Sequence, residues 1–191
     1  MNVPVDIVRL HERAMDEAAR LVDGVRPDQM GLPTPCSEWD VRTLIAHLVG
    51  GNIRFLDVAE GEARPERGPV NPDVLGDDPA GAYRRSAEAL RQAWRDPARL
   101  DQQCQLPIGV MPGRAALTLH LVETVAHAWD LARATGQQPA FDPDVVQAAA
   151  QFARSTMPED RPPGMPFAPP VPVADDLPEL DRLAAFLGRT P

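Results

Sequence analysis

One segment constrains the fold of this chain more than any other: LHLVETVAHAWDLARATG, which runs from residue 119 to residue 136. Its apolar residues cover nearly the whole circumference of the helix that their spacing predicts, so this helix needs packing neighbours on most sides. His120, Glu123 and His127 interrupt that apolar surface. Because an ionised carboxylate buried alone is unstable by several kcal/mol, Glu123 needs an arginine, a protonated histidine or a metal ion beside it.

Further helices are predicted around this central one. Apolar spacing and helix-ending residues place them at about 5–24, 40–60, 79–95, 114–135 and 142–155, with a short closing helix in 178–189. Ser37 or Asp40 is expected to cap the second helix, and residues 105–116 have the composition of a short hairpin. Four long helices joined by connections predict an all-α fold, a four-helix bundle with short extra helices.

The end of the chain has a different character. Eight prolines fall within residues 157–178, which excludes regular helix there. Met165, Phe167 and Val171 are poor choices for a free linker, so we expect this stretch to wrap the domain. We therefore expect residues 1–137 to form the helical bundle, and residues 138–191 to form a proline-rich C-terminal extension that packs on it as part of the same domain.

The spacing of Glu123 and His127 is what favours a metal ion. Residues four apart stack on one face of a helix with side-chain origins ~5 to 6 Å apart, close enough to chelate one ion. His47 in the second helix is the candidate third ligand, and Gly50 and Gly51 after it indicate that another backbone or a ligand approaches closely. Two imidazoles and one carboxylate with an open fourth position form the ligand set of a catalytic zinc site. A polar cluster that only satisfies itself in the core is the alternative.

Other polar and reactive residues are weaker candidates. We expect His120, one turn before Glu123, to orient that carboxylate rather than to serve as a fourth ligand. His11 is flanked by charged residues and is expected on the surface. Cys36 and Cys104 lack a flanking histidine, so neither stands out as a nucleophile. The HExxH pattern of zinc peptidases and the repeated Glu-x-x-His pattern of di-iron bundles do not occur.

The charge of the chain disfavours two classes of partner. With 28 acidic and 19 basic residues the net charge is -9, which disfavours nonspecific binding to nucleic acid or to anionic membranes. No stretch approaches the ~20 apolar residues of a membrane span, and the amino terminus lacks the pattern of a signal peptide. We therefore expect a cytoplasmic protein.

Two segments, taken in order, resemble a known family. LPTPCSEWDVRTLIAHLVGGN (residues 32–52) followed by LHLVETVAHAWDLARATG resembles the DinB-like metal-binding superfamily, in its branch related to the N-terminal domain of mycothiol-dependent maleylpyruvate isomerase. The closing DDLPELDRLAAFLGR is similar to a subgroup of actinobacterial proteins. The resemblance covers most of the chain. It implies a four-helix bundle with a divalent metal, commonly zinc with nickel as an alternative, held by His47, Glu123 and His127.

The same resemblance implies a function. Family members of known activity use a low-molecular-weight thiol, mycothiol in actinobacteria, which implies a thiol-dependent transferase or isomerase acting on a small electrophile. A divalent cation supplies the thiolate at neutral pH. The isomerase carries a further C-terminal domain, for which the tail here is too short, so maleylpyruvate isomerisation itself is not expected. The alternative from another class is a noncatalytic metal- or ligand-binding module. Dimers are common among relatives, which favours a homodimer.

Overall fold

The computed structural model describes residues 6–66, 68–161 and 166–191, and its regular structure is mostly helical. The helices are α1 (Ile7–Asp23), α2 (Val41–Ala59), α3 (Pro79–Trp94), α4 (Gly113–Thr135), α5 (Pro143–Thr156) and α6 (Glu179–Phe186). Short 3-10 turns lie at Pro27–Gln29, Pro72–Leu75 and Pro97–Leu100, and strand β1 (Gln103–Leu106) pairs antiparallel with β2 (Gly109–Pro112). The all-α prediction is confirmed, with the small hairpin where the sequence indicated one.

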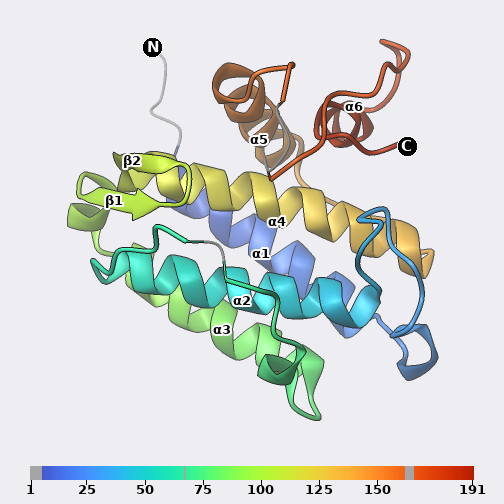
Figure 1. Cartoon of the computed structure of the whole chain (residues 1–191), viewed down its shortest axis with the longest axis horizontal. Coiled ribbons are helices and arrows are strands. Elements are labelled where there is room, and N and C mark those ends of the chain that lie inside the picture. Colours follow the sequence, from blue (N-terminus) through green and yellow to red (C-terminus); the bar gives the residue numbers. More distant parts are fainter. Residues whose placement is uncertain (1–5, 67, 162–165) are drawn as a thin grey trace.

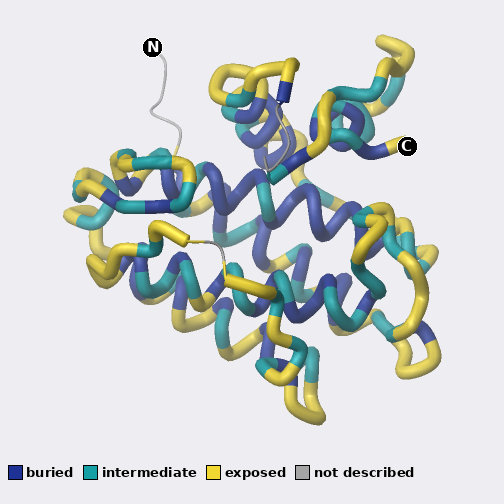
Figure 2. The backbone as a smooth tube through the Cα atoms, viewed as in Figure 1, coloured by how far each residue is buried: buried dark blue, intermediate teal, exposed yellow. Residues whose placement is uncertain are grey.

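The four long helices pack against one another as a bundle. α1 and α2 each contact both α3 and α4, while α5 contacts α4, α1 and α6. In the view of Figure 1, α5 and α6 lie on the opposite side of α4 from α2 and α3. α4 is therefore the central helix, and the dark blue along most of its length in Figure 2 shows how far it is buried. α4 thus has helices packed on several sides, as its nearly uniform apolar surface requires.

Local residues explain where the helices begin and end. The Asp40 carboxylate accepts a hydrogen bond from the Thr43 amide at 2.8 Å, which makes Asp40 the cap of α2. α4 ends at Gly136, whose φ of 70° lies in the left-handed region that glycine adopts without strain. Local residues thus fix the start of α2 and the end of α4, the two helices that carry the candidate ligands.

The C-terminal segment folds back on the bundle. Phe167 is buried, and the Val171 amide donates to the Ala185 carbonyl at 2.9 Å, which ties the proline-rich stretch to α6. Met165 lies outside the described residues. A division of the chain at residue 137 stays a prediction. Across the described ranges, no helix combines the length and the apolarity that crossing a membrane requires.

Candidate metal centre

The segment before α2 places one indole, that of Trp39, and one thiol, that of Cys36, over the end of the bundle. The Thr34 hydroxyl donates to the Trp39 carbonyl at 2.8 Å, and the Trp39 amide donates to the Cys36 carbonyl at 2.8 Å, so this turn is held in shape. The Trp39 ring centroid lies 4.4 Å from that of His47 and 5.7 Å from that of His127. The indole therefore covers both imidazoles.

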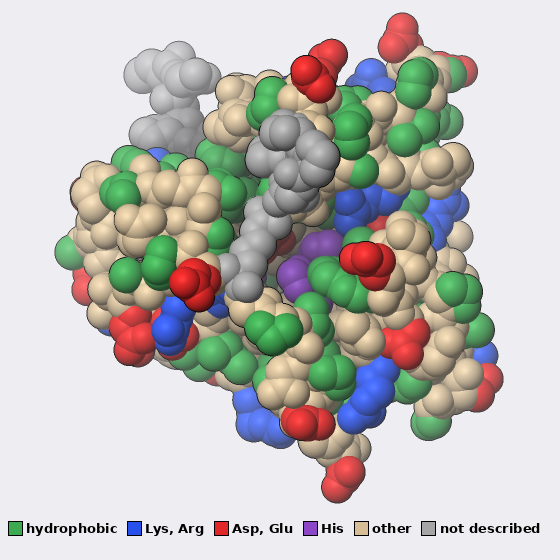
Figure 3. Space-filling view, in the orientation of Figure 1, with side chains coloured by type: hydrophobic (Ala, Val, Ile, Leu, Met, Phe, Trp, Pro, Cys, Tyr) green, Lys and Arg blue, Asp and Glu red, His purple; other side chains and the backbone are tan. Residues whose placement is uncertain are grey.

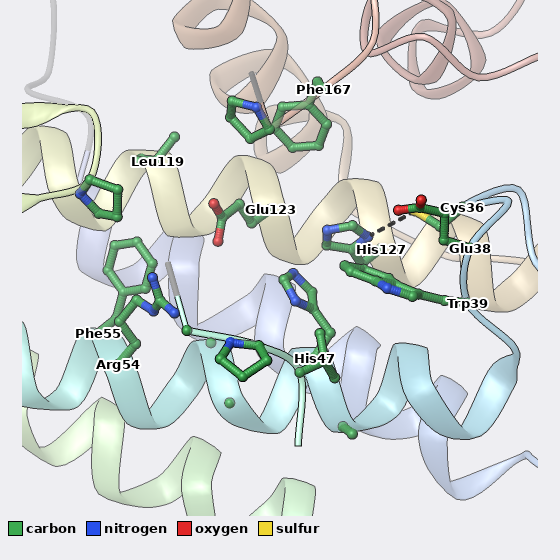
Figure 4. A pocket seen from close by; sticks show the side chains of 18 of the residues that line it. Cys36, Glu38, Trp39, His47, Arg54, Phe55, Leu119, Glu123, His127 and Phe167 are labelled. Carbon is green, nitrogen blue, oxygen red and sulfur yellow. Dashed lines mark hydrogen bonds between the residues drawn. The ribbon is translucent and has the colours of Figure 1, made fainter. Parts of the chain in front are cut away.

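The three predicted ligands face one cavity. His47 from α2 and His127 from α4 have ring centroids 4.7 Å apart and ring planes at 78°. Glu123, one turn before His127, points into the same cavity, as the close-up in Figure 4 shows. His127 is buried, and the other two are half-buried. The structure thus brings together the side chains that the sequence singled out; that they bind a metal ion stays a prediction.

The cavity itself has a volume of about 750 Å³. Its described walls come from residues 35–39, α2, residues 68–74, the hairpin, α4 and the C-terminal segment. Figure 3 shows histidine side chains in a hollow of the surface. Gly50 and Gly51 line it. A Cβ on Gly50 would meet no atom within 4 Å, and one on Gly51 would lie 3.7 Å from Nε2 of His120. Gly50 therefore faces open space and Gly51 faces a side chain, so among the described residues neither meets a crossing backbone. The approach of a ligand stays a prediction.

A carboxylate that the sequence reading did not single out lies behind His127. Oδ2 of Asp130 is 3.1 Å from Nδ1 of His127, and the Arg189 guanidinium donates to both carboxylate oxygens, at 2.8 and 3.1 Å. Because a carboxylate only accepts, this contact places a proton on Nδ1 of His127, so in the neutral imidazole the lone pair lies on Nε2. A carboxylate on the far nitrogen is typical of metal-binding histidines, since it fixes the tautomer and the ring orientation.

Asp130 is ionised despite its burial. Desolvation opposes the charge, but the hydrogen bonds from His127 and Arg189, together with the positive charge of Arg189, outweigh it and lower the pKa of Asp130 to about 2. One signal for this residue was present in the sequence, because Asp130 follows His127 by three positions and so lies on the same side of the helix. Arg189 offered none, since it lies 59 residues further along the chain.

Cys36 belongs to the same network. Its thiol donates to Oδ2 of Asp130 at 3.2 Å and accepts from Arg189 at 3.1 Å, and Nδ1 of His127 is 3.8 Å away. The sequence showed no histidine beside this cysteine because the neighbour comes from α4. Burial, followed by the charge of Asp130, raises the pKa of Cys36 to about 12. This thiol is therefore protonated and unreactive at neutral pH.

Cys36, His127 and Asp130 form a second group with metal-binding donors, all within 4.8 Å of one another. The Arg189 guanidinium donates to two of the three and is itself buried among them. A cation thus already neutralises this group, and a metal ion placed there would meet the arginine charge. The arrangement favours the set on the open side of His127, namely His47 and Glu123.

The expectation for His11 was wrong. This residue is only 1% exposed, and its Nε2 lies 2.7 Å from Nδ1 of His120, which joins α1 to α4. Charged neighbours suggested the surface, but His11 continues the buried row formed by Met15 and Ala18 at helical spacing. Burial lowers the pKa of both histidines, that of His120 to about 3, so the pair is neutral. A role for His120 in orienting Glu123 stays a prediction.

The fold defines a helical-bundle protein of the DinB-like class. The chain belongs to the mycothiol maleylpyruvate isomerase N-terminal domain family, whose model matches residues 11–132, more than half of it. Uncharacterised proteins from two strains of Mycobacterium tuberculosis are 40% identical over 187 residues, which cover 97% of this chain and 99% of each relative.

Solved structures agree on the fold. The crystal structure of the mycothiol-dependent maleylpyruvate isomerase matches with a TM-score of 0.63 at 20% identity, over 79% of this chain and 68% of that one. A mutant of the same enzyme gives 0.61 at 18% identity with the same coverage. At this level of identity the likeness establishes the fold. The DinB-like bundle predicted from the sequence is confirmed.

Proposed function

We propose that His47, Glu123 and His127 hold a divalent metal ion, zinc or alternatively nickel, in a thiol-dependent transferase or isomerase that acts on a small electrophile. One observation carries this proposal. The ring centroids of two imidazoles from different helices lie 4.7 Å apart in the cavity into which Glu123 points. Such a donor set leaves coordination positions for an external ligand, as catalytic zinc sites do.

Family membership supports the choice of a thiol as cosubstrate. The relatives of known structure are described as mycothiol-dependent, and we propose mycothiol or a similar low-molecular-weight thiol here. A divalent ion in this position would supply the thiolate form of such a thiol at neutral pH. The protein's own thiol does not compete for that role, because Cys36 remains protonated within its network with Asp130 and Arg189.

The surrounding residues have positioning roles in this proposal. Asp130 holds the proton on Nδ1 of His127 and keeps Nε2 directed away from the carboxylate. The Trp39 ring lies close to both imidazoles, and the centroid of the Phe167 ring lies 6.2 Å from that of His127. These aromatic walls limit water at the imidazoles, which strengthens electrostatic interactions there.

Metal content tests the ligand assignment. Purified protein is dialysed against zinc or nickel, freed of excess ion, and analysed by elemental mass spectrometry. We expect about one equivalent in the wild type, a loss in His47→Ala and Glu123→Gln, and full occupancy in Cys36→Ser, which alters only the second donor group. Loss of metal in Cys36→Ser with retention in His47→Ala would reverse the assignment. A wild type that stays metal-free with both ions would refute the metal site.

Thiol consumption tests the reaction. The metal-loaded protein is incubated with mycothiol and a panel of electrophiles, and free thiol is followed with time against a His47→Ala control. Consumption that requires His47 supports the enzyme. Binding of mycothiol without consumption across the panel supports instead a noncatalytic metal- or ligand-binding module. The homodimer also remains a proposal, and light scattering of the purified protein tests it.

A further inference from the structure

The ion pairs among the described residues leave one arginine of the cavity wall without a carboxylate. Arg54 of α2 is half-buried, and within the described chain its guanidinium donates to the Glu66 carbonyl at 3.2 Å. Asp57, three residues further along the same helix, pairs with Arg64 instead. Because a guanidinium carries five N–H donors, Arg54 retains donors for water or for a molecule bound in the cavity.

The other charges of the described walls lie elsewhere in the cavity. Figure 4 shows Glu38 at one end of it, Arg54 at the other, and Glu123 between them. Arg189 also lines the cavity but is paired with Asp130. Arg54 is therefore the charged group of its own end among the described residues, and a positive charge at the wall of a cavity favours an anionic group in the bound molecule.

α2 presents Arg54 to the same space as His47. The two residues are seven apart, about two turns of helix, so their side chains leave the same face roughly 10 Å apart along the axis. Gly50 and Gly51 lie between them and also line the cavity, and a Cβ on Gly50 would meet no described atom within 4 Å. This stretch of α2 is therefore an open floor that connects the guanidinium with the imidazole.

Hydrocarbon side chains flank the Arg54 end. Figure 4 shows Phe55 beside Arg54 and Leu119 across from it on α4, and both line the cavity. Ile108 lines it from the hairpin and is 49% exposed, so a bound molecule would remove apolar surface from water. A single charged group among apolar walls is typical of a site that fixes the orientation of a small organic molecule.

We propose that Arg54 binds a carboxylate of the electrophile, whose body lies along Gly50 and Gly51 with its reactive carbon toward the imidazoles. A guanidinium and a carboxylate match in charge and in planar geometry, so that two parallel hydrogen bonds form between them. The inference rests on the proposed function for the reacting end and adds the class of substrate, a small organic acid. Arg54 is a specificity-determining residue, because it recognises the acid and takes no part in bond making.

Hexanoate and hexanamide are matched probes, since they share a carbon chain and nearly the same shape but differ in charge. Each is titrated into the full-length protein before and after a chelator removes bound metal, and binding is followed by ligand-observed NMR. The chelated protein decides the outcome, because no metal there competes with Arg54 for the carboxylate. We expect hexanoate to bind at least about tenfold more tightly than hexanamide, as hydrogen bonds to charged groups imply.

Substitution of Arg54 should change the affinity for the acid alone. In Arg54→Gln we expect the preference for hexanoate to disappear while the affinity for hexanamide stays that of the wild type. Arg54→Lys keeps the charge without the paired donors, so it should keep part of the preference. Unchanged hexanamide binding also shows that the cavity of each variant is intact.

Arg42→Gln is the matched control. Arg42 is also a half-buried arginine of α2, and its guanidinium donates to a backbone carbonyl, that of Gly76 at 3.4 Å, but it is not among the described residues that line the cavity. We expect this variant to bind hexanoate as the wild type does. Hexanamide binding as tightly as hexanoate, failure of both probes to bind, equal effects of the two glutamine variants, or an equal loss of both probes in Arg54→Gln would each overturn the inference.

The two proposals can fail separately. A protein that holds metal and consumes thiol, yet shows no preference for the acid, would refute the carboxylate site and leave the proposed function intact. A protein that binds hexanoate through Arg54 but holds no metal would refute the proposed function and leave the cavity as a site for organic acids.

Discussion

Replacing Arg189 with alanine should destabilise the protein far more than a typical loss of an ion pair. Arg189 pairs with Asp130 through two hydrogen bonds, at 2.8 and 3.1 Å, and the side chains are only 7% and 0% exposed. The same guanidinium donates to Cys36 and to the Leu187 carbonyl and lies over the Phe167 ring. Its removal leaves a fully buried carboxylate with His127 and Cys36 as its remaining partners.

The magnitude follows from burial. The pKa of Asp130 is held at about 2 against an ordinary value of 3.8. A difference of nearly two units corresponds to about 2 kcal/mol in favour of the ionised form, although its burial opposes ionisation. Without the arginine that opposition is no longer balanced, and truncating one partner of a buried pair typically costs about 3–5 kcal/mol. For a chain of this length, this is a fall in Tm of roughly 6–20 °C.

Urea and thermal unfolding of metal-free protein at neutral pH measure this effect. Arg13→Ala is the control: Arg13 also binds two carboxylates, Asp142 at 2.9 Å and Asp144, but its side chain is 40% exposed. We expect that control to lose no more than about 1 kcal/mol. Adding Asp130→Asn to Arg189→Ala should restore part of the loss, because it removes the unpaired charge. Equal, small losses in Arg189→Ala and Arg13→Ala would refute the reasoning.

Three further outcomes are expected. Because the pKa of Asp130 is lowered in the folded protein, its ionisation stabilises the wild type above the ordinary pKa of 3.8, and this stabilisation is lost as the pH falls toward 2. Urea unfolding of the wild type and of Asp130→Asn from pH 7 downward should show the difference between their free energies of unfolding shrinking. A difference that stays constant with pH contradicts this prediction. Since burial raises the pKa of both Cys36 and Cys104, iodoacetamide should modify neither quickly in the native protein at pH 7.5, and rapid labelling seen by mass spectrometry would be incompatible with these environments. Gly136→Ala should lower the free energy of unfolding by about 1 kcal/mol, because the φ of Gly136 is 70°. Gly50→Ala, in a helix interior with open space around its Cβ, should raise the free energy of unfolding by roughly 0.5–1 kcal/mol. The reverse order would contradict both assignments.

Helix positions could be predicted because they depend on local patterns. The apolar residues around α4 required a central helix, Asp40 has the short acceptor side chain that a helix start needs, and Gly136 has the conformational freedom that a helix end needs. The charged neighbours of His11 predicted the surface, but its helical spacing to Met15 places it on the buried face of α1. Periodicity was the stronger signal, since burial follows from which face a residue occupies.

The candidate site was predictable only in part. Helical spacing placed Glu123 and His127 on one face, and the structure brings His47 into the same cavity. The same rule would have included Asp130, three residues after His127. Contacts between distant segments carry no comparable signal: Cys36 approaches His127 across 91 positions, and Arg189 reaches Asp130 across 59. Such pairs depend on how the turn before α2 and the C-terminal segment cross the end of α4.

The C-terminal segment is thereby a structural part of the site. Arg189 holds Asp130, Asp130 holds Nδ1 of His127, and Phe167 from the same segment packs beside that imidazole. The orientation of a proposed ligand thus depends on residues at the end of the chain, through a connected set of hydrogen bonds that is buried from solvent. A buried polar network of this kind holds one arrangement only while all its members are present. The C-terminal segment therefore fixes the orientation of the His127 imidazole toward the cavity, which α4 alone does not do.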